Sequence, residues 1–345
     1  MTQDQPCQSP FVLSLNRMRK GLDYVQQLVD PVLQSSILLE NRSSFEIVEY
    51  SLLPKGERER PYLMKLAAEA CDGDFGRILD AAAAIELLHF STLVLDDVLD
   101  SSQLRRHIAT AASQFGQNKA IAAGELLAAL SYKSLLRTAT DDGADQTRVI
   151  RSLSILSKTH ADIYEGQLLD LIYERDLYVT EKQYYGMIRL TTGSLVSCSM
   201  RMAAILSGAD STYESALADY GSLVGVAMQM RDDLDEVIYE RDLIGKQPGG
   251  DIKQGKMRLP VILALRLTEG ERRRTIEDTI RSTGGRTQDI HDCLRSIREC
   301  GAIDLAKQRV NETTRRAIEC LTDIPNTDAR DRLEEFAIII GRAWQ

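Results

Sequence analysis

Two long stretches of the chain are apolar on nearly every face, and each ends in a group of acidic residues. Residues 81–95 (AAAAIELLHFSTLVL) lead directly into DDVLD, and residues 220–230 (YGSLVGVAMQM) lead into RDDLDE. A helix that is apolar all round is buried on most of its sides. The pattern therefore predicts two core helices whose carboxyl-terminal ends carry carboxylates.

The rest of the chain also favours helices. Alternating β-branched runs are scarce, helix-forming residues are frequent, and no proline lies between Pro61 and Pro248. The breaks between apolar segments are too short to serve as interdomain linkers. We therefore predict an all-α protein with a disordered tail at residues 1–10 and one domain at residues 11–345.

Composition and charge narrow the functional class. The chain has 345 residues, 43% of them hydrophobic, and a formal net charge of −9. This balance argues against nucleic-acid binding, which needs a basic surface. No CxxC pair and no signal peptide are visible, so we expect reduced thiols and a cytoplasmic protein. Residues 81–95 are too short for a membrane span and contain Glu86 and His89, so we predict no transmembrane segment.

The acids that follow the two apolar segments share one spacing. They occupy positions i, i+1 and i+4, as Asp96, Asp97 and Asp100 in the first group and Asp232, Asp233 and Glu236 in the second. This spacing gathers them into one patch on a helix. A single patch of this kind is more often solvated, but two patches that both end buried helices favour a shared cavity. Their repulsion there would be relieved by Mg²⁺, which prefers oxygen ligands and is completed by substrate phosphates.

Basic residues follow both acidic groups. Arg105 and Arg106 come shortly after the first group, and arginine binds phosphate through two parallel hydrogen bonds. The glycine-rich segment GKQPGGDIKQGK places Lys246 and Lys256 on either side of Asp251. Each cation alone would be interpreted as a solvated side chain. Their order relative to both acidic groups favours a phosphorylated ligand.

Seven segments, in this order, resemble the trans-isoprenyl diphosphate synthases, the polyprenyl synthetases of the all-α isoprenoid-synthase fold. They are GERERP (56–61), ELLHFSTLVLDDVLDSSQLRR (86–106), AAGELLA (122–128), YEGQLLDL (164–171), TTGSL (191–195), MQMRDDLDE (228–236) and GKQPGGDIKQGKMRLP (245–260). The resemblance implies a helical bundle around a central cavity, in which two Asp-rich helices face each other. It also implies a homodimer.

The resemblance assigns roles to individual residues. About three Mg²⁺ ions per site would be held by Asp96, Asp97, Asp100, Asp232, Asp233, Glu236 and Asp251. The allylic diphosphate would be bound by Arg105, Lys246 and Lys256, isopentenyl diphosphate by Arg60, His89 and Arg106, and the reacting region would be lined by Gln167, Asp170, Thr192 and Gln229. The residues expected to matter most for catalysis are Asp96, Asp97, Arg105, Asp232 and Lys246. For His89, a buried core histidine is the alternative interpretation.

The mechanism implied is metal-assisted loss of diphosphate from the allylic substrate, attack by the double bond of isopentenyl diphosphate, and loss of a proton. Product length in the family depends on the cavity below the first acidic motif. Ser91 and Thr92 are small there, and Phe90 points elsewhere on the helix. We expect a product of C20 or longer, unless deeper residues close the cavity.

The chain also departs from the family pattern. Glu57 and Thr191 stand where the family has lysines, and Glu236 replaces an aspartate. Lys55 is a candidate replacement for the lysine missing at position 57. Because these changes fall mainly on the second-substrate side, alternatives stay open. They are a terpene-synthase-like lyase or cyclase, a prenyltransferase with another acceptor, and a catalytically weak partner subunit, although the intact DDVLD motif argues against the last.

Overall fold

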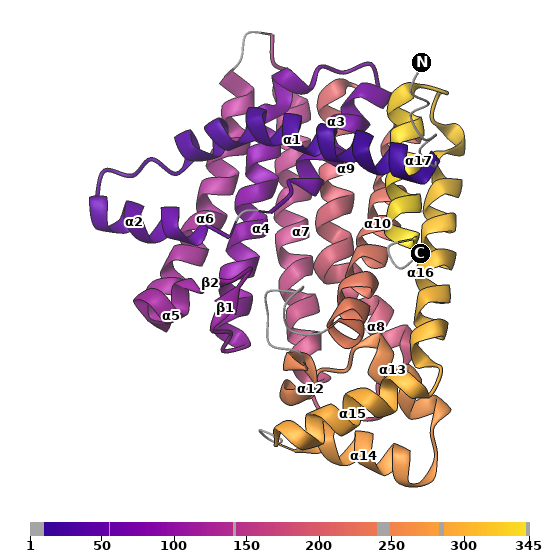
Figure 1. Ribbon diagram of the computed structural model, residues 1–345. Helices are drawn as coiled ribbons and strands as arrows, with labels where there is room; N and C mark the ends of the chain where they lie inside the picture. The colour runs from indigo at the N-terminus through magenta and orange to yellow at the C-terminus, as the bar shows by residue number, and fades with distance from the viewer. Residues whose placement is uncertain (1–9, 55, 141–142, 240–248, 283–285, 343–345) are drawn as a thin grey trace, which may run out of the picture.

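The structure is a computed structural model that describes residues 10–54, 56–140, 143–239, 249–282 and 286–342. The described residues are helical apart from loops and one small hairpin, so the predicted all-α class is confirmed (Figure 1). The predicted tail, residues 1–10, lies outside the described residues except for Pro10, where the first helix begins. That residues 11–345 form a single domain stays a prediction.

The element bounds follow the chain in order. The amino-terminal half contains α1 (Pro10–Ser36), α2 (Arg42–Ser51), α3 (Glu59–Ala70), η1 (Phe75–Ile78), α4 (Leu79–Leu99), β1 (Leu104–Arg105), β2 (Ile108–Ala109), α5 (Ala111–Phe115), α6 (Gln117–Arg137), η2 (Thr138–Thr140) and α7 (Gln146–Ile172). The second half contains α8 (Glu181–Ile188), η3 (Arg189–Gly193), α9 (Ser194–Ser207), α10 (Ser211–Ile238), α12 (Gly250–Gln254), α13 (Leu259–Leu267), α14 (Gly270–Arg281), α15 (Thr287–Glu299), α16 (Ala302–Glu319), η4 (Cys320–Asp323) and α17 (Asp328–Gly341).

The two apolar stretches form the central helices α4 and α10. Both are largely buried, as expected from their all-round apolar faces. Small residues let α6 pack closely on α4, since a Cβ at Gly124 would stand 2.7 Å from Leu95 Cγ. The two helices run in the same direction, so both of their acidic ends lie toward the lower end of the bundle in Figure 1.

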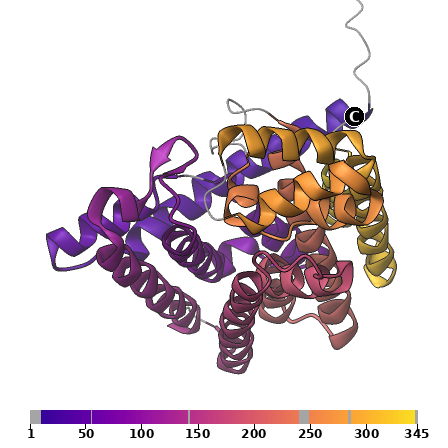
Figure 2. The same cartoon turned by 90° about the horizontal axis from the view of Figure 1, so that it is seen from below.

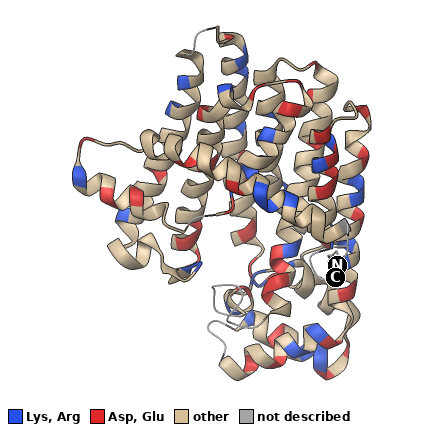
Figure 3. Ribbon diagram, turned by 45° about the horizontal axis from the view of Figure 1, so that its top comes forward, with Lys and Arg blue, Asp and Glu red and all other residues tan. Residues whose placement is uncertain are grey.

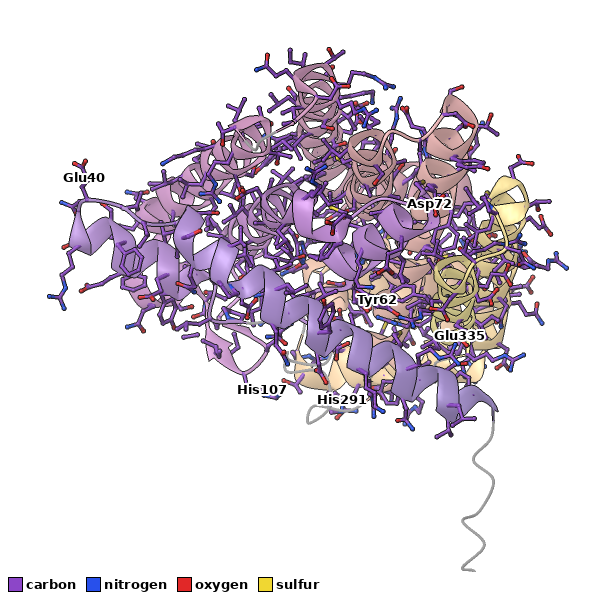
Figure 4. The ribbon with its side chains drawn as sticks, turned by 90° about the horizontal axis from the view of Figure 1, so that it is seen from above. Glu40, Tyr62, Asp72, His107, His291 and Glu335 are labelled. Carbon is purple, nitrogen blue, oxygen red and sulfur yellow. The ribbon has the colours of Figure 1, made fainter. Side chains whose placement is uncertain are left out.

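Helix α1 crosses the opposite end of the bundle. It packs against α3, α4 and α17, and Figure 4 shows it running across the view from above, past Tyr62 and Glu335. Arg17 forms an ion pair with Glu335 at 3.3 Å, and the rings of Tyr62 and Phe336 lie 6.2 Å apart. Seen from below in Figure 2, α14 and α15 lie on the opposite side of the bundle from α2.

Within the part of the chain that the structure describes, one helix is long and apolar enough to cross a membrane. It spans Phe75–Leu99, combining η1 with α4, and is therefore longer than the segment predicted from the sequence. Two thirds of its most apolar window, 67%, is buried inside the bundle. Its composition is thus accounted for by its place in the protein core.

Candidate active site

The acidic ends of α4 and α10 face one cavity of about 750 Å³. Besides Glu59 from α3, its acidic lining residues are Asp96 from α4, Asp100 at the C-cap of that helix, Asp232, Asp233, Asp235 and Glu236 from α10, and Asp251 from α12. Acidic segments near this end of the bundle are red in Figure 3. The predicted meeting of two acidic walls is therefore present in the geometry, although the roles of these residues stay predictions.

Asp97 differs from its neighbours because it is held by Arg105. It is buried, and Arg105 donates to both of its carboxylate oxygens, from Nε at 2.9 and 3.0 Å and from Nη2 at 2.8 Å. Two parallel charge-assisted bonds of this kind fix both side chains. The β1–β2 hairpin brings Arg105 back onto α4, so it lines the cavity while remaining paired with Asp97.

The wall carboxylates lie in an environment that disfavours their charge. Burial, followed by repulsion from Asp100, raises the pKa of Asp96 to about 7. Burial likewise raises the pKa of Asp233 to about 6, although it accepts hydrogen bonds from Tyr184 Oη at 2.6 Å and Gln229 Nε2 at 2.8 Å. A nearby cation would favour the ionised forms.

Oxygen donors of this kind fit Mg²⁺. Among the described residues, however, no three acidic, histidine or cysteine side chains are close enough to form a ready-made metal cluster. The two walls therefore share a cavity without being drawn together into one binding cluster.

A cationic end of the cavity contains the residues predicted for isopentenyl diphosphate. Arg60, His89 and Arg106 all line it, and Arg60 Nη1 lies 3.1 Å from His89 Nε2. Burial, and then the charge of Arg60, holds the pKa of His89 well below its ordinary value. His89 is therefore neutral and can accept a hydrogen bond from Arg60. Its place in the cavity wall argues against the core-histidine interpretation.

Lys256 and Asp170 lie behind the wall rather than on it. Lys256 is fully buried, and its Nζ lies 2.6 Å from Asp170, 2.9 Å from Glu174 and 3.0 Å from Asp100. In this arrangement Lys256 ties α4 to α7 instead of projecting into the cavity. Lys246, the other lysine predicted to bind the allylic diphosphate, lies outside the described residues, as does Lys55.

The reacting region contains three of the four predicted polar residues, since Asp170 lies behind the wall. Gln167, Thr192 and Gln229 line the cavity, and Thr192 Oγ1 donates to Gln229 Oε1 at 2.6 Å. Thr191 and Thr192 belong to the π-helical turn η3, a local irregularity that often occurs at functional sites.

The sequence predicted that the carboxylate of Glu57 would lie at the second-substrate site. In the structure, the carboxylate that lines the cavity is that of Glu59. Glu57 is exposed and does not line the cavity, whereas Glu59, in the first turn of α3, does. Burial raises the pKa of Glu59, against the opposing charge of Arg231. The expectation that Glu57 lies at the second-substrate site is therefore not supported. The sequence signal for Glu59 was its place one residue before Arg60.

Aromatic residues that the sequence interpretation missed lie near Ser91, below the first acidic motif. Thr92 lines the cavity, but Ser91 is buried and does not. The hydroxyl of Ser91 lies beside that of Tyr164 on α7, and neither has a well-formed hydrogen bond. The ring of Tyr164 lies 5.3 Å from that of His160 at a tilted angle of 57°, and His160 Nδ1 lies 2.8 Å from Tyr132 Oη. Bulk near Ser91 therefore comes from α6 and α7, from side chains that do not themselves line the cavity.

Arg258 is a further cavity residue that the sequence interpretation missed. It lines the wall beside the second acidic group and forms ion pairs with Asp170 and Asp251. Its sequence signal was its place two residues after Lys256.

A helical bundle around a cavity with two acidic walls and a cationic end is the architecture expected of an isoprenoid synthase. The family model described as polyprenyl synthetase matches residues 42–297, and the chain belongs to this family. The family, the fold and the enzyme class predicted from the sequence, a prenyltransferase, are thereby confirmed.

Several proteins with assigned names are similar to this chain over most of its length. A geranylgeranyl pyrophosphate synthase of Geoglobus acetivorans is 34% identical over 86% of this chain and 90% of its own length. An octaprenyl diphosphate synthase of Escherichia coli is 31% identical over 89% and 91%. A crystal structure of a Caulobacter crescentus polyprenyl synthase, complexed with calcium and isoprenyl diphosphate, superposes with a TM-score of 0.87 at 26% identity, covering 97% of this chain and 99% of that one.

Proposed function

We propose that this prenyltransferase condenses an allylic prenyl diphosphate with isopentenyl diphosphate and releases a trans-prenyl diphosphate of C20 or longer. The observation that carries the proposal is the arrangement of one cavity, in which carboxylates from α4 and α10 face each other and Arg60, His89 and Arg106 form a cationic end. The names of the relatives, which include geranylgeranyl and octaprenyl diphosphate synthases, support this product range.

The acidic walls would hold the allylic diphosphate through Mg²⁺. When bound, Mg²⁺ supplies the positive charge that stabilises a departing diphosphate. The carboxylates at the ends of α4 and α10 that face the cavity are its proposed ligands, together with Asp97, which Arg105 now holds. Arg105 is placed to donate hydrogen bonds to the same leaving group.

The cationic end would hold the second substrate. Arg60 and Arg106 can donate to its diphosphate, while neutral His89 fixes the orientation of Arg60. The apolar cavity residues Leu195 and Met228 exclude water from the allylic cation. The double bond of isopentenyl diphosphate then attacks this cation, and the proton lost from the new chain goes to the released diphosphate.

One observation favours a second candidate function. Glu59 places a carboxylate in the cavity beside Arg60, where it would weaken the binding of a second diphosphate. An enzyme that ionises a prenyl diphosphate without isopentenyl diphosphate would be less affected. The second candidate is therefore a terpene-synthase-like lyase or cyclase, or a prenyltransferase with another acceptor. A catalytically weak partner subunit fits less well, because such a subunit would not need the acidic walls.

We further propose that the protein is a cytoplasmic homodimer that associates through α6 and α7. Large apolar side chains are exposed along these helices, including Ile121 at 42%, Leu168 at 60% and Ile172 at 68%. Sedimentation should give twice the chain mass, and Leu168→Glu should shift it toward the monomer. A wild-type protein that sediments as a monomer would refute the dimer.

A product assay tests the proposed reaction. The purified protein is incubated with Mg²⁺ and dimethylallyl, geranyl, farnesyl or geranylgeranyl diphosphate, with and without isopentenyl diphosphate, and the products are identified by chromatography and mass. Elongation predicts longer prenyl diphosphates only when isopentenyl diphosphate is present. Hydrocarbons or alcohols formed without it would support the second candidate instead.

A further inference from the structure

A permanent cation stands in the second acidic wall. Arg258 directly precedes α13, and the chain reaches it from α12 through Gly255, whose φ of +78° is readily adopted by glycine. The Arg258 side chain is 16% exposed and lines the cavity. Its guanidinium therefore stands among the carboxylates that a divalent metal would use.

Arg258 is bound by carboxylates on two sides. Its Nη1 lies 2.5 Å from Asp170 Oδ1, and its Nε lies 2.8 Å from Asp251 Oδ2. Its charge also acts on Asp233, where it opposes the effect of burial. A guanidinium is not deprotonated in proteins, so this charge is present at every working pH.

The two acidic walls differ in which of their carboxylates are paired with cationic side chains. At the end of α4, Arg105 engages Asp97 and Lys256 pairs with Asp100 from behind the wall, while Asp96 and Asp100 still line the cavity. On the other side, Arg258 engages Asp251, which itself lines the cavity. A metal ion that used Asp251 would have to displace a charge-assisted hydrogen bond in a mostly buried setting, or bind next to a fixed positive charge.

We propose that Arg258 is a resident cation that replaces one divalent ion at the second wall, so that Asp251 binds Arg258 rather than metal. The inference rests on the proposed function, because it concerns the same metal–diphosphate site. The protein then binds one divalent ion fewer per site than the about three that the family resemblance implies. Arg258 also supplies its charge to the diphosphate leaving group directly from the cavity wall.

The test counts metal ions rather than turnover. The full chain is titrated with Mn²⁺ in the presence of inorganic diphosphate, and the bound ions per chain are counted by electron paramagnetic resonance. Asp251→Asn should leave the count unchanged, because the asparagine oxygen can still accept from Arg258. Arg258→Gln should raise the count by one ion per chain. The double variant Arg258→Gln/Asp251→Asn should return to the wild-type count.

The controls separate this inference from the proposed function. Arg258→Lys keeps the charge and should keep the wild-type count, and circular dichroism checks that each variant is folded. The inference is overturned if Asp251→Asn alone loses an ion, an outcome that does not require Arg258→Gln to fold. If the wild-type protein binds Mn²⁺ and diphosphate but Arg258→Gln gains no ion, the inference also fails while the proposed function stands. A wild-type protein that binds no Mn²⁺ contradicts both.

Discussion

Replacing Arg58 with alanine should destabilise the protein strongly. Only 3% of the Arg58 side chain is exposed, and it joins three elements. Its Nε donates to Asp30 Oδ1 of α1 at 2.9 Å, and its Nη1 donates to Glu86 Oε2 of α4 at 3.1 Å. The guanidinium carbon lies 5.3 Å from the ring centre of Phe90. Arg58 directly precedes α3, which carries Arg60 into the cavity.

The structure sets the size of the effect. Glu86 is as buried as Arg58, with 3% of its side chain exposed, so Arg58→Ala leaves it without its counter-charge. Removal of one partner from a buried ion pair costs about 3–5 kcal/mol. The lost cation–π contact adds about 1 kcal/mol. The two contributions together give about 4–6 kcal/mol. Because Asp30 is partly exposed, at 24%, the loss of its ion pair adds little, and the total stays near the lower end of this sum. We expect a loss of about 4 kcal/mol in the free energy of unfolding.

Urea unfolding at one fixed protein concentration measures this loss, because any dimerisation would make stability depend on concentration. Arg42→Ala is a matched control, since Arg42 and Glu46 form an ion pair in which Arg42 is 92% exposed. That control should change the free energy of unfolding by less than about 1 kcal/mol. The double variant Arg58→Met/Glu86→Leu should recover most of the loss. If Arg58→Ala costs no more than the control, the reasoning is refuted.

Three other predictions concern the cavity. Asp97→Ala should abolish turnover in the product assay, and unchanged turnover would contradict the metal-site assignment. Glu57→Lys should leave the KM for isopentenyl diphosphate unchanged because Glu57 lies outside the cavity, whereas Glu59→Gln should lower it; the reverse order would show that the placement of these two carboxylates is wrong. Tyr164→Ala should lengthen the product and Ser91→Tyr should shorten it by mass spectrometry, and an unchanged product from both would place the chain-length floor elsewhere.

The sequence predicted the parts of the fold that follow from local patterns. The all-round apolar faces of α4 and α10 and the spacing of their acids were sufficient to place two carboxylate walls at the ends of buried helices. The position of Glu59 could not be fixed this way. Which of Glu57 and Glu59 faces the cavity depends on where α3 begins, and Arg58 has a left-handed backbone with φ of +58° just before that helix.

Contacts between segments far apart in the chain could not be predicted from the sequence either. Lys256 was expected in the cavity, but Asp170 on α7 and Glu174, which follows that helix, draw it behind the wall. Likewise, the space near Ser91 was predicted only from its neighbours on α4, whereas the bulky side chain beside it is Tyr164 of α7. Both outcomes depend on how α7 packs against the first acidic wall, and no local pattern in the sequence determines that packing.

The central claim is that the protein couples ionisation of an allylic diphosphate to attack by isopentenyl diphosphate. The most direct measurement counts the inorganic diphosphate released and the labelled isopentenyl diphosphate incorporated in the same reaction with Mg²⁺ and farnesyl diphosphate. The account predicts equal amounts of the two, and no diphosphate release when isopentenyl diphosphate is left out. Diphosphate released without isopentenyl diphosphate, or in clear excess over its incorporation, would contradict the account.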